Sequence, residues 1–130
     1  MDLWTIQMAQ WRVARDLKIP LLDTTIKSGD RVFAPSWDIV EQVKEGTLSQ
    51  LAYTELYTQL MRDSYRVNQL RWIEVCQMPV VAISCYCPDG DFCHRHVLAE
   101  MFKRVCQHQK ITFTLKGELT KRHRPELGEG

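Results

Sequence analysis

The sequence predicts a small α/β protein with a parallel sheet of about four strands and helices on both faces. Three observations support this fold class. Short apolar runs alternate with segments in which apolar residues recur at helical spacing. Residues 80–83 (VVAI) are continuously apolar and half β-branched, which is typical of a strand buried on both faces. A length of 130 residues suits one domain with a single core.

Each element follows from its own local pattern. Ser36 is a good helix N-cap and Gly46 a good helix stop, so a helix is expected between them. Residues 49–77 lack Gly and Pro and predict either one long helix or two abutting helices. Strands are expected at 3–8, 19–23, 80–83 and 111–115, further helices at 11–18 and 93–107, and a loop at 24–37. Residues 1–115 should therefore form one domain, with 116–130 as a loosely ordered C-terminal tail.

Composition limits the classes of function. A formal net charge of +1 gives no field for wrapping duplex nucleic acid or coating an anionic membrane, although a small local basic site remains compatible with it. Neither a membrane span nor a secretory signal is visible, so a cytoplasmic location is expected. Five cysteines in such a compartment indicate thiols, metal ligands or packing residues rather than a disulfide framework.

Two polar loops are expected at one edge of the sheet. In parallel α/β sheets the ligand crevice lies beyond the carboxyl ends of the strands. The loop after Asp23 and the loop after Cys85 both leave the sheet at that edge. The sequence therefore places a candidate binding crevice between these two loops.

The stretch 84–102 (SCYCPDGDFCHRHVLAEMF) is compatible with anion binding. Cys93, His94 and Arg95 fall in the first turn of the predicted helix, where backbone donors are unpaired and the helix dipole is positive. The planar guanidinium of Arg95 suits phosphate or carboxylate. The alternative is that Arg95 points into solvent.

The same stretch supports two further hypotheses. Cys93, at a helix start near Arg95 and two histidines, has surroundings that lower a thiol pKa and would suit a nucleophile; alternatively it packs as a small apolar residue. A zinc ion would use ligands from Cys85, Cys87, Cys93 and His94 or His96. The knuckle spacing of two residues between cysteines is absent, so no metal is predicted.

The loop DTTIKSGDRVFAPSW supplies the other half of the crevice. Hydroxyls, one ammonium and one guanidinium suit a sugar-phosphate better than an apolar ligand. Phe33 and Trp37 would either stack on a base or anchor the loop to the core, and anchoring is favoured. The candidate ligand-binding residues of this loop are Asp23, Thr24, Thr25, Lys27, Ser28 and Arg31.

With both loops in view, the chain resembles the bacterial and phage branch of the family called domain of unknown function 488. The matching segments are 21–37 (LLDTTIKSGDRVFAPSW), 54–66 (TELYTQLMRDSYR) and 83–102 (ISCYCPDGDFCHRHVLAEMF). The resemblance implies a compact Rossmann-like fold and a shared site that includes Asp23, Cys93, His94 and Arg95. It implies no particular reaction.

Three functions are compatible with these features. The leading one is binding of a nucleotide-like or other phosphate-containing small molecule, for example to sequester a nucleotide signal. The second is an enzyme, a hydrolase or glycosyl transferase on a nucleoside or nucleotide, with Cys93, Asp23 and His94 as catalytic residues. The third is a zinc-supported interaction module. No cofactor, duplex nucleic acid or membrane partner is expected, whereas a homodimer would suit so small a sheet.

Overall fold

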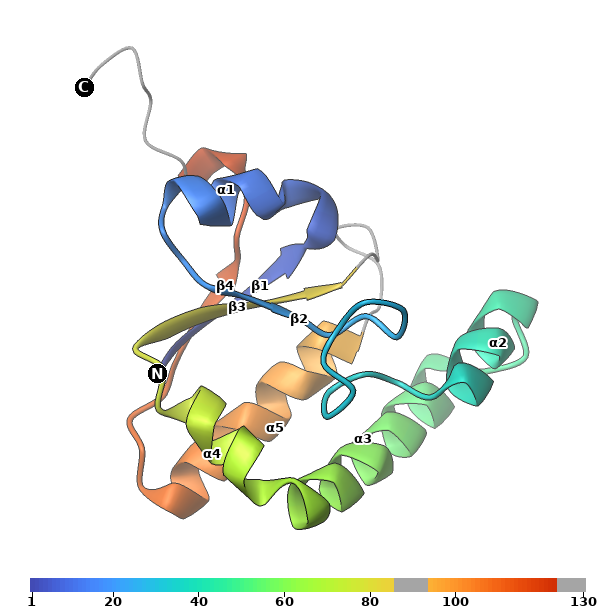
Figure 1. Ribbon diagram of the computed structural model, residues 1–130. Coiled ribbons are helices and arrows are strands. Elements are labelled where there is room, and N and C mark those ends of the chain that lie inside the picture. Colours follow the sequence, from blue (N-terminus) through green and yellow to red (C-terminus); the bar gives the residue numbers. More distant parts are fainter. Residues whose placement is uncertain (86–93, 124–130) are drawn as a thin grey trace.

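The computed structural model describes residues 1–85 and 94–123, which fold around a four-stranded parallel sheet (Figure 1). The strands are β1 (Asp2–Gln7), β2 (Leu21–Asp23), β3 (Val80–Cys85) and β4 (Thr114–Glu118), in the spatial order β2-β3-β1-β4. Every strand pair is parallel. The carboxyl ends of all four strands therefore meet at one edge, and the small Rossmann-like α/β class is confirmed.

Helices cover both faces of this sheet, as expected (Figure 1). Helix α1 (Trp11–Asp16), which follows the 3-10 turn η1 (Met8–Gln10), lies on one face. The other face carries α3 (Gln50–Val67), α4 (Gln69–Cys76) and α5 (His94–Gln109), while α2 (Trp37–Glu45) packs on α3 beyond the sheet. None of the helices in the described ranges is both long and apolar enough to cross a bilayer.

Local capping chemistry sets the bounds of α2 and α3. The Ser36 hydroxyl accepts from the Ile39 amide at 3.3 Å, and Gly46 ends α2 in the left-handed region at φ 71°. Ser49 caps α3 in the same way as Ser36 caps α2. The long segment 49–77 proves to be two abutting helices, since Asn68 leaves the helical region at φ −118° and ψ 36°.

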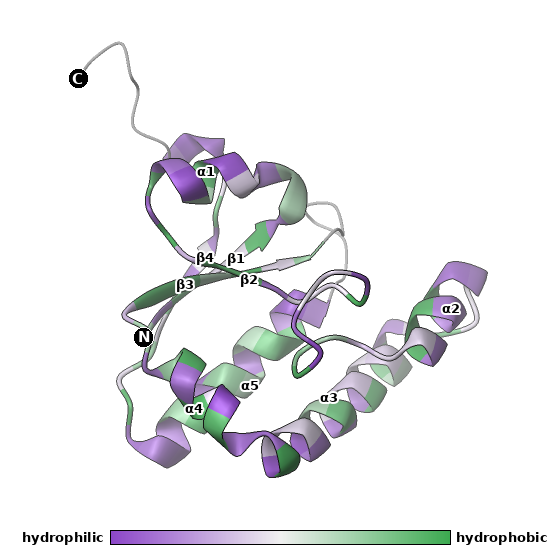
Figure 2. Cartoon of the chain, in the orientation of Figure 1, coloured by the Kyte–Doolittle hydropathy of each residue, from purple (hydrophilic) through white to green (hydrophobic). Residues whose placement is uncertain are grey.

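Two apolar clusters lie on opposite faces of the sheet. The larger packs Leu3, Val81 and Ile83 against buried residues of α3, α4 and α5, including Trp72 and Phe102. The smaller packs Ile6, Val13, Ala14, Ala82 and Leu119 under α1. Figure 2 shows the apolar side of α5 turned toward the sheet. Successive side chains of β1 and β3 point to opposite faces of the sheet, so each of these strands contributes residues to both clusters.

Strand β4 lies later in the chain than expected. It begins at Thr114 and ends at Glu118, so residues 116–118 belong to the sheet rather than to a loose tail. Leu119 is fully buried, and the 3-10 turn η2 (Lys121–His123) follows it. The alternating side chains Ile111 and Phe113 instead pack, half-buried, against the larger cluster. Residues 124–130 lie outside the described residues.

Two cysteines are packing residues of the larger cluster. Cys76 on α4 and Cys106 on α5 are both free thiols and fully buried. Burial raises the pKa of both thiols, that of Cys76 strongly. A protonated, buried thiol behaves as a small apolar side chain, which is the packing role expected for some of the cysteines.

Candidate functional site

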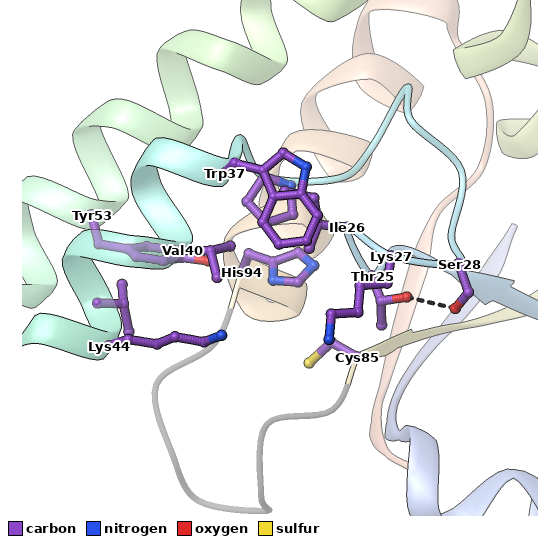
Figure 3. Close-up of a pocket in the computed structure, with 12 residues that line it drawn as sticks. Thr25, Ile26, Lys27, Ser28, Trp37, Val40, Lys44, Tyr53, Cys85 and His94 are labelled. Carbon is purple, nitrogen blue, oxygen red and sulfur yellow. Dashed lines mark hydrogen bonds between the residues drawn. The ribbon is translucent and has the colours of Figure 1, made fainter.

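A pocket of about 710 Å³ opens at the carboxyl edge of the sheet (Figure 3). One wall is the loop after β2, and the opposite wall is α2 with the start of α3. The end of β3 and the start of α5 complete it. The lining residues are Thr25, Ile26, Lys27, Ser28, Pro35, Trp37, Val40, Val43, Lys44, Tyr53, Cys85 and His94.

The pocket contains part of the residue set expected from the sequence. Thr25, Lys27, Ser28 and His94 line it. Four candidates are placed elsewhere: Asp23 and Thr24 lie directly behind the lining, Arg31 is exposed outside the lining, and Arg95 is buried behind the wall. Cys93 lies outside the described residues, so its expected role stays a prediction.

Asp23 organises the loop rather than facing the pocket. One carboxylate oxygen accepts from the Thr25 amide at 2.9 Å and from the Thr25 hydroxyl at 2.7 Å, while the other accepts from the Ser28 hydroxyl at 2.7 Å. Thr25 and Ser28 are also 3.0 Å apart through their hydroxyl oxygens. A side chain that bonds its own backbone two residues on is typical of an Asx turn. Asp23 therefore fixes where the Thr25 and Ser28 hydroxyls stand.

Glycine at position 29 permits this fold of the loop. A Cβ at Gly29 would lie 2.5 Å from the Asp23 carbonyl oxygen, 2.5 Å from the Thr25 nitrogen and 2.6 Å from the Thr25 carbonyl oxygen. All three atoms belong to the backbone, so none can rotate away. The loop closes on itself through Gly29 N–H to the Thr25 carbonyl and Asp30 N–H to the Asp23 carbonyl, at 2.9 and 2.7 Å.

The second half of the loop is held by three side chains of α3 and α4 that are spaced seven residues apart in the sequence. The Tyr57 and Ser64 hydroxyls donate to the carbonyls of Phe33 and Val32 at 2.5 and 2.6 Å. The Arg71 guanidinium donates to Asp30 at 2.9 Å. Tyr57 and Ser64 lie on one side of α3, because seven residues make about two helical turns, whereas Arg71 contacts the loop from α4.

The two aromatic residues of the loop have different roles. Phe33 is fully buried and packs edge-on against Trp72 with ring centroids 4.9 Å apart, so it anchors the loop as expected. Trp37 is 52% exposed and lines the pocket. The favoured anchoring role therefore holds for Phe33, whereas Trp37 presents an indole face to the pocket (Figure 3).

His94 joins the two halves of the site. Its Nε2 lies 2.9 Å from the Thr24 hydroxyl oxygen and 3.1 Å from the Thr24 carbonyl oxygen. The Thr24 hydroxyl donates its proton to the Ser84 carbonyl at 2.8 Å. Nε2 must therefore carry the proton that both Thr24 oxygens accept. Burial lowers the pKa of His94 to about 4, so the imidazole that lines the pocket is neutral at pH 7.

Arg95 lies outside the described lining of the pocket. Its side chain is fully buried, and its guanidinium donates to both carboxylate oxygens of Glu118, at 3.3 Å from Nε and 3.2 Å from Nη2. A third donor lies 3.0 Å from the Cys85 sulfur. Glu118 also accepts from the Thr5 hydroxyl at 2.5 Å. Arg95 thus pairs with a carboxylate of its own chain.

Cys85 also differs from its expected role. It is disulfide-bonded. The sequence favoured thiols, metal ligands or packing residues over a disulfide framework, and the disulfide at Cys85 differs from that expectation. Residues 1–85 and 94–123 contain no cluster of three or more His, Cys, Asp or Glu side chains that could hold a metal. Two of the expected zinc ligands, Cys87 and Cys93, fall outside these ranges.

Sequence reasoning missed the wall that α2 and α3 contribute. Val40, Val43 and Lys44 come from α2, and Tyr53 comes from α3. Figure 3 shows the side chains of Lys27 and Lys44 extending toward each other from opposite sides of the pocket. A one-turn spacing of Val40, Val43 and Lys44 on one helix side was the available signal. It did not show that this side faces a loop instead of the core.

The fold and the pocket define a small parallel α/β protein with a pocket at the carboxyl edge of its sheet. A family model described as the active DUF488-N3 subclade matches residues 7–105, from the last residue of β1 into α5, and includes every lining residue named above. The chain therefore belongs to the DUF488 family. Neither the curated proteins nor the solved structures include a match to this chain.

Proposed function

We propose that this protein binds a nucleotide-like small molecule in the pocket at the carboxyl edge of the sheet. The observation that carries the proposal is the composition of the lining. Apolar and aromatic side chains form most of the surface, and a few polar groups and two ammonium groups stand among them. Its volume of about 710 Å³ lies in the range of small-molecule sites, roughly 300–1,000 Å³.

The apolar part of the lining suits a planar base. Trp37 offers a half-exposed indole, and Ile26, Val40 and Pro35 supply aliphatic surface. An aromatic ring stacks on any base because each base has a π-face, a contact worth about 1–3 kcal/mol. Thr25 and Ser28, held by Asp23, place hydroxyl groups where sugar hydroxyls would need partners.

The charged part of the lining suits a phosphate. Lys27 and Lys44 supply positive charge from two walls, and no carboxylate stands among the described lining residues. His94 is neutral at pH 7 and adds a hydrogen-bonding group without a charge. The proposal thus assigns anion binding to two lysines, in place of Arg95.

Tryptophan fluorescence tests the binding function. Among the described lining residues Trp37 is the tryptophan, whereas Trp11 stands on α1 across the sheet. Titration with AMP, ADP and ADP-ribose should quench the emission of the wild-type protein and of Trp11→Phe. Trp37→Phe should lose most of that quenching. Equal quenching in Trp37→Phe and the wild type would contradict the assigned pocket.

Calorimetry tests the anion contact. Lys44→Ala should weaken binding of the best nucleotide in that panel by roughly tenfold, the effect of about 1.4 kcal/mol. Lys103→Ala removes the same group from an exposed position on α5 outside the lining and should leave affinity unchanged. The corresponding nucleoside should respond little to either variant. An equal response of nucleoside and nucleotide to Lys44→Ala would count against a phosphate at this position.

Catalysis on a nucleoside or nucleotide is the second candidate. The observation that favours it is the buried, neutral His94 in the lining, together with the description of the matching subclade as active. A neutral imidazole is competent as a base or hydrogen-bonding group. Chromatography of nucleotide mixtures should then show new products, which Cys93→Ser or His94→Gln abolishes and Lys103→Ala preserves. Recovery of intact nucleotide from a saturated protein supports binding without turnover.

A further inference from the structure

Exposed basic side chains gather on α1 and η2, away from the pocket. Arg12, Arg15 and Lys18 belong to α1 and its C-terminal end, and Lys121 and Arg122 belong to η2; all five are exposed. We call these five residues the basic face. The carboxylate on these two elements is Asp16, which pairs with Arg15 at 3.1 Å. In a chain of net charge +1, this is a pronounced local excess of positive charge.

The fold brings the two segments together although about a hundred residues separate them. Leu119, just before η2, is fully buried in the cluster that contains Val13 and Ala14 of α1. His123 packs edge-on against Trp4 of β1 with ring centroids 5.0 Å apart. Figures 1 and 2 show η2 beside α1, with hydrophilic colouring over both elements. The two segments that carry the basic face therefore lie next to each other on the side of the sheet opposite α5.

Two guanidinium groups lie over the Trp11 indole within the basic face, and we call this group the Trp11 stack. The guanidinium carbon of Arg12 lies 4.6 Å and that of Arg15 5.1 Å from the centroid of the Trp11 indole. Trp11 itself is 36% exposed. Nucleic-acid bases stack on aromatic rings and on guanidinium planes alike. This surface thus combines phosphate-binding charge with a platform for an unpaired base.

We propose that the basic face binds single-stranded nucleic acid, with the five cations on phosphates and the Trp11 stack on a base. Three of the five cations are arginines, which suit bidentate phosphate contacts. Duplex binding is disfavoured because paired bases cannot reach the stack, and α1 is too short to follow a groove. A membrane surface is disfavoured because membrane binding requires an extended apolar face. Among the described residues of these two elements, Trp11 is the only large apolar side chain that is exposed.

Fluorescence anisotropy with a labelled oligothymidylate tests the proposal on the full chain. Binding should weaken with salt, because each phosphate contact on a single strand contributes a slope of about −0.7 in log K against log salt. Five contacts set the limit at about −3.5. The double variant Arg12→Glu/Arg122→Glu should abolish binding. Absence of salt-sensitive binding by the wild type at low salt would overturn the proposal.

Lys18 and Lys110 form a matched pair for this experiment. Both hold left-handed backbone, at φ 58° and 59°, one after α1 and the other after α5 on the opposite side of the sheet. Glycine relieves the same strain at each position, so Lys18→Gly and Lys110→Gly should both keep or raise the Tm. Lys18→Gly should lower oligonucleotide affinity several-fold and the salt slope by about 0.7, whereas Lys110→Gly should change neither.

Equal loss of affinity in Lys18→Gly and Lys110→Gly would show that binding depends only on the net charge of the protein, and would overturn the proposed site. Tighter binding of an annealed duplex than of either strand would overturn the choice of partner. The choice of partner would also be overturned if phosphatidylserine vesicles bind in a way that depends on Arg12 and Arg122 and oligothymidylate does not bind. Unchanged nucleotide binding in all these variants is expected, since the basic face and the pocket are separate surfaces.

Discussion

His94 shows how burial sets the chemistry of a single residue. The residue is 6% exposed, and its ring packs edge-on against Tyr57 with ring centroids 5.3 Å apart. Its Nε2 contacts the carbonyl and hydroxyl oxygens of Thr24. Burial disfavours the charged form, so the pKa falls well below its usual value. The histidine therefore enters the pocket as a neutral group with a defined tautomer.

This burial predicts a dependence of stability on pH. The unfolded pKa is about 6.5 and the folded pKa about 4, so the unfolded chain binds the proton more readily. The contribution of neutral, buried His94 to the free energy of unfolding is fully present above pH 6.5. It is lost as the pH falls toward 4, by up to about 3 kcal/mol. Urea unfolding across this range should show the decline. His94→Gln should flatten it, whereas His108→Gln on the exposed end of α5 should not.

Arg95 marks the limit of prediction at the residue scale. An arginine in the first turn of a helix reasonably suggests an external anion, and the pattern at 93–96 supports a helix start. The partner that neutralises it, Glu118, lies 23 residues away in a segment expected to be a tail. No local pattern indicates such a pairing, because it depends on the register of β4 against β1.

The loop after β2 is the element that shapes the pocket. Its first half is held by Asp23 and its second half by α3 and α4. Polar and turn-forming composition predicted a loop and several of its pocket residues. The α2 wall was not predictable, because the amphipathic pattern of α2 shows that one side is apolar but not what that side packs against.

Gly29→Ala should displace this loop. The new methyl group would overlap three backbone atoms, so the turn must open and carry Thr25 and Ser28 with it. We expect nucleotide binding to be lost together with a lower Tm. At Gly46 a Cβ meets nothing within 4 Å, and Gly46→Ala should cost only about 1 kcal/mol through its positive φ. Normal binding by a fully folded Gly29→Ala protein would contradict the role of the turn.

Ser64→Ala should loosen the second half of the loop. The hydroxyl donates to the Val32 carbonyl and accepts from the Trp72 indole at 3.2 Å, so its removal leaves two part-buried groups unsatisfied. The expected loss is about 1–3 kcal/mol in urea unfolding. Thr54→Ala removes an exposed hydroxyl from the same helix and should cost less than about 0.5 kcal/mol. Equal costs would show that the anchor contributes nothing.

At the scale of the whole molecule, a buried polar cluster connects three parts of the fold. Arg95 of α5, Glu118 of β4 and Thr5 of β1 meet on the α5 side of the sheet. The alternation of apolar runs predicted the parallel sheet and its helices on both faces. It did not predict that the edge strand β4 carries the counter-ion of the pocket-side helix.

The homodimer expected from the small sheet stays a prediction for light scattering.

Glu118→Ala should destabilise the whole chain. It leaves the fully buried guanidinium of Arg95 without its carboxylate, a loss of about 3 kcal/mol or more. The double variant Arg95→Met/Glu118→Met should recover much of the loss, because neither charge is then left unpaired. Calorimetric unfolding measures both. A double variant less stable than Glu118→Ala would show that the cluster stabilises the fold through more than charge pairing.

The buried thiols of Cys76 and Cys106 can report how often the protein opens transiently. Both thiols are inaccessible, and burial keeps them protonated. An alkylating reagent needs an exposed thiolate, so it reacts with these sulfurs only while α4 and α5 are transiently separated. The rate of their labelling under native conditions therefore reports how often the core between the two helices comes apart.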